Sequence, residues 1–214
     1  MAKGINQLIK SYKIKKDEIK KRLDEFKEVL NQSDERIFAE LAFCICTPQS
    51  KATAAWNSIT TLVKNDYLFS GSDKVIKPFL NTVRFCDNKA KYIVETRNSF
   101  TKGNILQIKE KIKSFDDSFK LREWLVENVK GFGMKESSHF IRNIGLGSDL
   151  AILDVHILKT LKEYGVIEEI PENLTKKVYL EIESKMRYFS KLVKIPMNEL
   201  DLLFWSEETG MIFK

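Results

Sequence analysis

The spacing of apolar residues, in a chain poor in glycine and proline, most constrains what this sequence folds into. The 214 residues include only 9 glycines and 4 prolines, so few residues are present that form tight turns or interrupt regular elements. Ser33 is expected to cap a helix in which Ile37, Phe38, Leu41 and Ile45 recur with the period of one buried face. The pattern predicts an all-α protein of about ten helices, without strong strand alternation.

Local signals indicate where some of these helices lie. The first part of the chain predicts a basic amphipathic helix in which Ile19, Leu23 and Phe26 share one face. Asn104 is expected to cap a helix that carries Ile105 and further isoleucines. Pro196 is expected to open the last helix, since proline suits the first helical position.

Charge and cysteine usage narrow the class of partner and of site. Lys and Arg number 36 against 30 Asp and Glu, a formal net charge of +6, and this balance favours an anionic partner, nucleic acid above all. The three cysteines, Cys44, Cys46 and Cys86, fit a reducing compartment without disulfides. They fall short of the four thiolates that an iron–sulfur cluster or an all-cysteine zinc site needs.

Membrane association is not expected. The sequence has no run of about 18 apolar residues, the length that suits a transmembrane helix. Its first residues lack the apolar stretch of a secretory signal peptide. Together with the cysteine usage, this predicts a cytoplasmic protein.

Gly131-Phe132-Gly133 interrupts the helical pattern between two expected helices. Two closely spaced glycines permit a tight turn that other residues resist. They also let a phosphate approach main-chain N–H groups at the start of the next helix. Such a hairpin contacts a DNA backbone without reading its sequence. The same residues suit a plain turn between packed helices, so the turn alone leaves both interpretations open.

Lys135 follows the hairpin in the first turn of the expected helix, where the helix dipole disfavours a cation. That position gives a solvated lysine little advantage, whereas it favours the neutral amine that a nucleophile needs. The apolar run 150–153 then leads to Asp154 at the start of another helix. Asp154 suits an N-cap, and capping is compatible with a catalytic role for its carboxylate.

Together these residues resemble the helix-hairpin-helix superfamily of DNA glycosylases. The hairpin, lysine and Asp-x-His of that superfamily fall on Gly131-Phe132-Gly133, Lys135 and Asp154-Val155-His156. More closely, the stretch from Lys135 and the tail Glu199–Trp205 are similar to the second type of 8-oxoguanine DNA glycosylase/lyase, found in archaea and some bacteria. The likeness extends over nearly the whole chain.

The resemblance implies a bifunctional enzyme of base-excision repair, a DNA N-glycosylase that is also an abasic-site lyase. Lys135 would attack C1′ of a flipped 8-oxoguanine nucleotide, displace the base and form a Schiff base with the opened sugar. β-Elimination would then cut the strand. Asp154 would help to activate the amine and stabilise positive charge on the sugar. Neither step needs a metal or redox cofactor, and the superfamily suggests only a monovalent cation at the hairpin.

The resemblance also implies residues that bind the oxidised base. Phe85 and Trp205 match aromatic walls of the base pocket. Lys214 matches a final lysine whose carboxylate or side chain takes part in reading the base. From the sequence alone, Phe85 and Trp205 equally suit core packing, and Lys214 suits a chain end without a role.

Gly131, Gly133 and His156 match the family's contacts to the DNA backbone. His156 equally suits an exposed histidine at the start of a helix. The expected partner is double-stranded DNA that contains 8-oxoguanine, bound by a monomer.

Two helical subdomains with the active-site cleft between them follow from the pattern and the resemblance. Residues 34–153 would form a central domain that ends in the helix-hairpin-helix region. Residues 1–33 would join residues 154–214 in the second domain.

Two other interpretations stay open. A lysine-dependent glycosylase for oxidised pyrimidines, like endonuclease III, shares the hairpin and the lysine. That class usually carries four C-terminal cysteines for an iron–sulfur cluster, and no cysteine follows Cys86 here. A non-enzymatic helix-hairpin-helix DNA-binding module would explain the hairpin and the charge. It would not explain Lys135 together with Asp154, or the tail.

Overall fold

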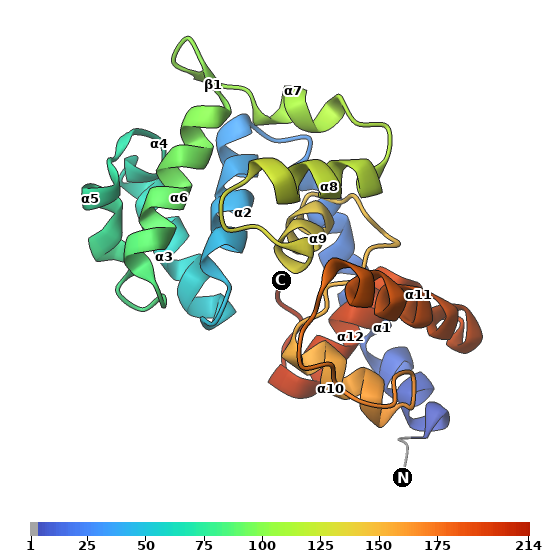
Figure 1. Cartoon of the computed structure of the whole chain (residues 1–214). Helices are drawn as coiled ribbons and strands as arrows, with labels where there is room; N and C mark the ends of the chain where they lie inside the picture. Colours follow the sequence, from blue (N-terminus) through green and yellow to red (C-terminus); the bar gives the residue numbers. More distant parts are fainter. Residues whose placement is uncertain (1–3) are drawn as a thin grey trace.

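The computed structural model describes residues 4–214, and nearly all of its regular structure is helical (Figure 1). The helices of this part of the chain are α1 (Ile5–Val29), α2 (Asp34–Cys46), α3 (Ala52–Lys64), α4 (Tyr67–Ser70), α5 (Asp73–Ile76), the 3-10 helix η1 (Lys77–Leu80), α6 (Cys86–Ser99), α7 (Ile108–Lys113), α8 (Ser118–Asn128), α9 (Met134–Asn143), α10 (Val155–Glu163), α11 (Lys176–Val193) and α12 (Met197–Thr209). The all-α prediction is confirmed. None of the described helices combines the length and apolarity that crossing a membrane requires.

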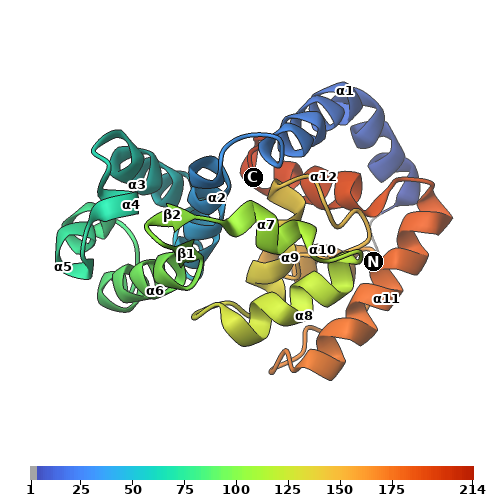
Figure 2. The same cartoon turned by 90° about the horizontal axis from the view of Figure 1, so that it is seen from above.

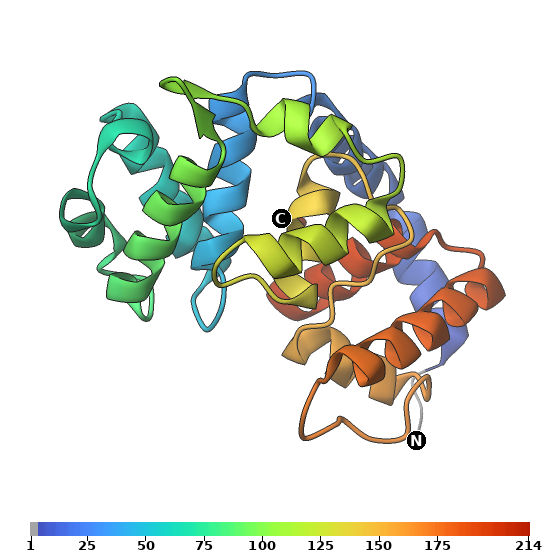
Figure 3. The same ribbon diagram turned by 45° about the horizontal axis from the view of Figure 1, so that its top comes forward.

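Two separate sets of buried apolar side chains hold these helices together. The first core region draws its buried residues from Val29 to Leu150 and is built by α2 to α9. The second core region draws on residues 8–26 and 151–212, from α1 and α10 to α12. Figures 1 and 3 show the same grouping, with the blue N-terminal helix lying among the orange and red C-terminal ones. The bounds of the predicted subdomains stay a prediction.

The predicted amphipathic first helix is confirmed. Ile19, Leu23 and Phe26 of α1 are buried, whereas most of the lysines on the helix are exposed. The buried face contacts α12 and α9, and Figure 2 shows α1 beside α12 although the two are far apart in sequence. α1 therefore completes the core of a group of helices formed by the end of the chain.

α2 is the central helix of the first core region. Its N-cap Ser33 accepts a hydrogen bond from Arg36 N at 3.3 Å, as the sequence predicted. Every residue from Ile37 to Cys46 is buried, because α2 contacts α3, α6, α7 and α9. One of these buried residues is a carboxylate, Glu40.

The prediction of a helix capped by Asn104 is wrong. Two-residue strands, β1 (Thr101–Lys102) and β2 (Ile105–Leu106), pair in antiparallel fashion around Gly103 and Asn104. Both turn residues have positive φ, 54° and 68°, which a two-residue hairpin demands and which glycine and asparagine supply. The helix begins only at Ile108, in α7.

Candidate active site

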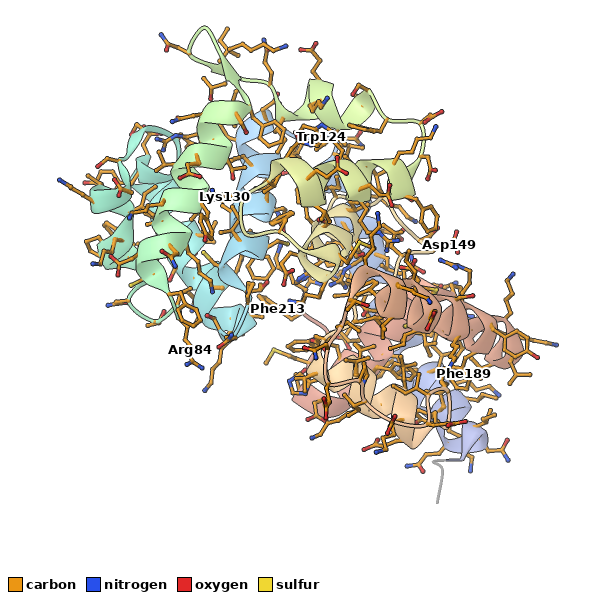
Figure 4. The ribbon with its side chains drawn as sticks, viewed as in Figure 1. Arg84, Trp124, Lys130, Asp149, Phe189 and Phe213 are labelled. Atoms are coloured by element: carbon orange, nitrogen blue, oxygen red, sulfur yellow. The ribbon has the colours of Figure 1, made fainter. Side chains whose placement is uncertain are left out.

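The turn between α8 and α9 needs a glycine at position 131. Gly131 has a φ of +84°, and a Cβ there would lie 2.7 Å from Cδ2 of Tyr92. Phe132 N donates to Val129 O at 3.1 Å, and Gly133 N donates to the Glu136 carboxylate at 3.1 Å. The position of the hairpin can be found in Figure 4 from the label of the exposed Lys130, which directly precedes Gly131. The sequence-predicted helix-hairpin-helix is therefore present, with α9 starting directly after the tight turn.

A cavity of about 750 Å³ lies where α9, α12 and the segment before α10 meet the loop between α2 and α3. Its walls come from both core regions and from the last residues of the chain. Phe213, one of the lining residues, is labelled between the two groups of helices in Figure 4. The lining residues are Thr47, Gln49, Ser50, Lys51, Ala52, Thr53, Lys135, His139, Arg142, Ile152, Asp154, Val155, His156, Asp201, Trp205, Thr209, Met211, Phe213 and Lys214.

Lys135 enters this cavity from the first turn of α9, just beyond the hairpin. Its side chain is 20% exposed, and its ammonium nitrogen lies 3.7 Å from Glu136 Oε1. Asp154 lines the same cavity from the start of α10. The fold thus brings together the amine and the carboxylate that the sequence singled out.

Asp154 is held by three N–H donors. Its Oδ1 accepts from His156 N at 2.9 Å and from Ile157 N at 2.8 Å, as the N-cap of α10. Its Oδ2 accepts from the indole Nε1 of Trp205 at 3.1 Å. The N-cap interpretation is confirmed, and the bond to Trp205 fixes the second oxygen at the cavity wall.

Trp205 and His156 form the aromatic side of the cavity. Their ring centroids lie 5.9 Å apart in an edge-on arrangement. The imidazole Nδ1 of His156 lies 3.2 Å from Glu208 Oε1, and the His156 side chain is 39% exposed. His156 is therefore near the mouth of the cavity, where solvent has access, and Trp205 is partly buried.

The deeper wall contains ionisable side chains that the sequence did not single out as site residues. Burial lowers the pKa of the His139 imidazole well below its usual value, and Arg142, Lys135 and Lys214 lower it further. Burial raises the pKa of Asp201 to about 6, against the opposing effect of Arg142. Arg142 and Asp201 pair at 3.4 Å, both nearly fully buried.

Phe85 does not line the cavity. It is 54% exposed on the turn before α6, beside Arg84, whose guanidinium lies 5.4 Å from the ring centroid. Figure 4 labels Arg84 at the lower edge of the first core region. Phe85 has a φ of +57°, in the left-handed region that bulky residues avoid. Phe85 is therefore not part of the packed core. Its contact with the oxidised base stays a prediction.

The sequence contained weak signals for the residues that it missed. Asp201 stands in an apolar run between Leu200 and Leu202, and Glu40 follows Phe38 and Ala39. A charged residue in a buried helical stretch requires a partner. Arg36, one helical turn before Glu40, is the only one of their charged partners that spacing could have indicated. The partners Arg142 of Asp201 and Lys214 of Glu40 lie far away in sequence.

Among residues 4–214, no group of three or more His, Cys, Asp and Glu side chains is arranged to hold a metal ion. The hairpin cation suggested by the superfamily stays a prediction.

Comparison with known proteins places this geometry in a family. A family model described as 8-oxoguanine DNA glycosylase matches residues 19–195. A protein of Fusobacterium nucleatum, named 8-oxoguanine DNA glycosylase/AP lyase, is 48% identical over 210 residues, covering 98% of this chain and 97% of its own. The fold is similar to the crystal structure of Methanocaldococcus jannaschii 8-oxoguanine DNA glycosylase, with a TM-score of 0.87, 37% identity, and coverage of 98% of this chain and 95% of that one.

A second crystal structure of the M. jannaschii protein, in complex with a 15mer DNA containing 8-oxoguanine, is also similar. It has a TM-score of 0.84 and 36% identity, over 97% of this chain and all of that one. The resemblance seen in the sequence is therefore confirmed: the chain belongs to the helix-hairpin-helix family of 8-oxoguanine DNA glycosylases.

Proposed function

We propose that the protein removes 8-oxoguanine from double-stranded DNA and then cleaves the abasic strand, with Lys135 as the nucleophile. The observation that carries this proposal is that Lys135, Asp154 and Trp205 line one and the same cavity. Lys135 enters it from the helix that directly follows the hairpin. The relatives with similar sequence and fold carry the corresponding name, 8-oxoguanine DNA glycosylase/AP lyase. The cytoplasmic location and monomeric state expected from the sequence remain predictions.

The chemistry needs a base that has left the helix stack, because C1′ of a stacked nucleotide is out of reach. The neutral amine of Lys135 attacks C1′, the glycosidic C–N bond breaks, and its electron pair leaves with the base, which takes up a proton. Opening of the sugar gives an imine between C1′ and Lys135. Removal of a C2′ proton then expels the 3′ phosphate by β-elimination.

Asp154 stabilises the positive charge that develops at the sugar. Its three N–H donors fix the carboxylate at the wall, so no reorganisation is needed when that charge appears. Trp205 both donates one of these bonds and offers its ring to an extruded base. The first turn of α9 suits the adjacent phosphates, whereas the amides of Phe132 and Gly133 already donate to acceptors within the hairpin region.

Borohydride trapping tests the proposal. The protein is incubated with duplex DNA that contains one 8-oxoguanine, and reduction of the imine should give a covalent protein–DNA adduct. Lys135→Gln should abolish the adduct, whereas Lys185→Gln, at an exposed lysine on α11, should retain it.

Other outcomes favour the alternatives. An adduct with thymine glycol but not with 8-oxoguanine would favour an oxidised-pyrimidine glycosylase. DNA binding without an adduct on any lesion, or on an abasic site, would leave a binding module.

A further inference from the structure

The last five residues, 210–214, form a strap that runs from the second core region to the first. α12 ends at Thr209, and its C-cap Gly210, with a φ of +77°, turns the chain out of the helix. Ile212 is buried in the second core region. Met211, Phe213 and Lys214 line the cavity that also holds Lys135. The strap is therefore a wall of the cavity that belongs to no helix or strand.

The far end of the strap is fixed by the side chain of Lys214, which is only 7% exposed. Its ammonium contacts the carboxylate of Glu40 and lies 3.8 Å from the ring centroid of Trp56. Burial lowers the pKa of Lys214, and Glu40 opposes that shift. A buried ammonium needs such a partner, because without one its charge is strongly disfavoured away from water.

Glu40 is fully buried in α2 and does not line the cavity. Besides Lys214, it pairs with Arg36 at 2.6 Å and accepts from Nδ2 of Asn143 at 3.2 Å. Asn143 ends α9, the helix that carries Lys135. One carboxylate thus connects the strap with the helix of the nucleophile and fixes their relative position.

We infer that Glu40 is a positioning residue for base excision: it holds Lys214, and with it the strap, as the wall against which the extruded base is seated. The inference rests on the proposed function and goes beyond it by assigning a role to a residue outside the cavity. A base has to fit between its walls before Lys135 attacks, whereas an abasic site has no base to seat. Loss of the Glu40 contact should therefore separate the two reactions.

Glu40→Gln tests this, because it keeps the shape and the acceptor for Asn143 but removes the charge that binds Lys214 and Arg36. Single-turnover excision of 8-oxoguanine should fall by about tenfold or more, since small misplacements near a reacting centre are costly. Cleavage of a preformed abasic site, and its borohydride adduct, should stay within about twofold of the unmodified protein. Glu35→Gln, at an exposed glutamate of the same helix, is the matched control and should change neither reaction.

A second variant keeps the test informative if Glu40→Gln folds poorly. Lys214→Met preserves an unbranched side chain without the charge, and it should show the same split between the two reactions. The double variant should be no worse than either single one, because both remove the same contact. Unchanged excision in Glu40→Gln or in Lys214→Met, or equal losses of excision and abasic cleavage, would overturn the inference. An unmodified protein that gives no adduct with 8-oxoguanine would instead overturn the proposed function, and with it this inference.

Discussion

Burial shifts two side chains that line the cavity, His139 and Asp201, toward their neutral forms. Burial is the largest cause of both shifts, lowering the pKa of His139 and raising that of Asp201 to about 6. The same physical effect therefore gives them opposite influences on stability in mild acid.

His139→Gln should make the protein less sensitive to acid. The folded state resists protonation of His139, whereas the unfolded chain takes up that proton with a pKa of about 6.5. The favourable contribution is therefore present above pH 6.5 and is lost as the pH falls below it, by about 1.4 kcal/mol at pH 5.5. Urea unfolding at pH 7.5 and 5.5 should show the original protein losing stability relative to the variant.

Asp201→Asn gives the control of opposite sign. Because the folded state binds this proton more tightly, the original protein should gain stability relative to Asp201→Asn as the pH falls from about 6 to 4. Parallel pH curves for the original protein and His139→Gln would contradict the assignment of a neutral, buried imidazole.

At the scale of residues, the sequence predicted those site residues that their neighbours in the sequence point out. Lys135 and Asp154 stand at helix starts that glycines and an apolar run define. The contact between Glu40 and Lys214 joins residues 174 positions apart, and only the packed fold brings them together. Phe85 has a residue type that suits a base pocket, and it lies exposed on the turn before α6, outside the residues that line the cavity.

At the scale of elements, the α8–α9 hairpin depends on Gly131. Gly131→Ala adds a Cβ in a left-handed conformation and 2.7 Å from the Tyr92 ring. Gly103→Ala adds one in the β1–β2 turn with a φ of +54° and no atom within 4 Å. Gly103→Ala is the control and should lower the free energy of unfolding by about 1–2 kcal/mol, from the backbone conformation alone. Gly131→Ala should lower the free energy of unfolding further and weaken DNA binding.

A further substitution separates strain from steric overlap. Tyr92→Ala removes the ring that the new Cβ would meet. Gly131→Ala should therefore cost less free energy of unfolding in the Tyr92→Ala background than in the protein with the intact tyrosine. Chemical denaturation of both backgrounds measures the difference. Equal effects of Gly131→Ala and Gly103→Ala would mean that the close approach to Tyr92 contributes nothing.

The long helices could be predicted because each buries one face over several turns. α1, α2 and α12 follow from periodic apolar residues and from Ser33 and Pro196 at their starts. α4 and α5 have four residues each, too few to show a helical period, and they raise the number of described α-helices above the predicted ten or so. The β-hairpin was missed because Asn104 suits both a helix cap and a turn, and the preceding Gly103 decides for the turn.

At the scale of the whole molecule, buried charges cross between the two core regions. Arg122 of α8 binds Glu183 of α11, Arg142 of α9 binds Asp201 of α12, and Glu40 binds Lys214. Paired charges tolerate little displacement once they are buried, because a charge that loses its partner there is strongly destabilising. The cavity lies in the same region, so these pairs also fix the position of its walls relative to one another.

The Arg122–Glu183 pair permits a direct test, because an exposed pair joins the same two helices. Arg122 donates to both Glu183 oxygens, at 2.5 and 3.0 Å, and Ala151 N donates to Glu183 at 2.8 Å. Glu183→Gln leaves Arg122 buried without a counter-charge and should cost about 3–5 kcal/mol. Glu123→Gln breaks the 2.7 Å pair with Lys176, where both side chains are more than half exposed, and should cost less than about 1 kcal/mol.

The denaturant guanidinium chloride is a salt, and its ions screen charges. Unfolding in urea, which is uncharged, is therefore the suitable measurement for both variants. The loss in Glu183→Gln should persist at high salt, since water and ions do not reach the pair, which is 2% exposed on each side. The loss in Glu123→Gln should shrink with added salt. Similar losses for the two variants would show that burial adds nothing to the connection between α8 and α11. The two core regions would then be held together by apolar packing, and the shape of the cavity between them would not depend on its buried charges.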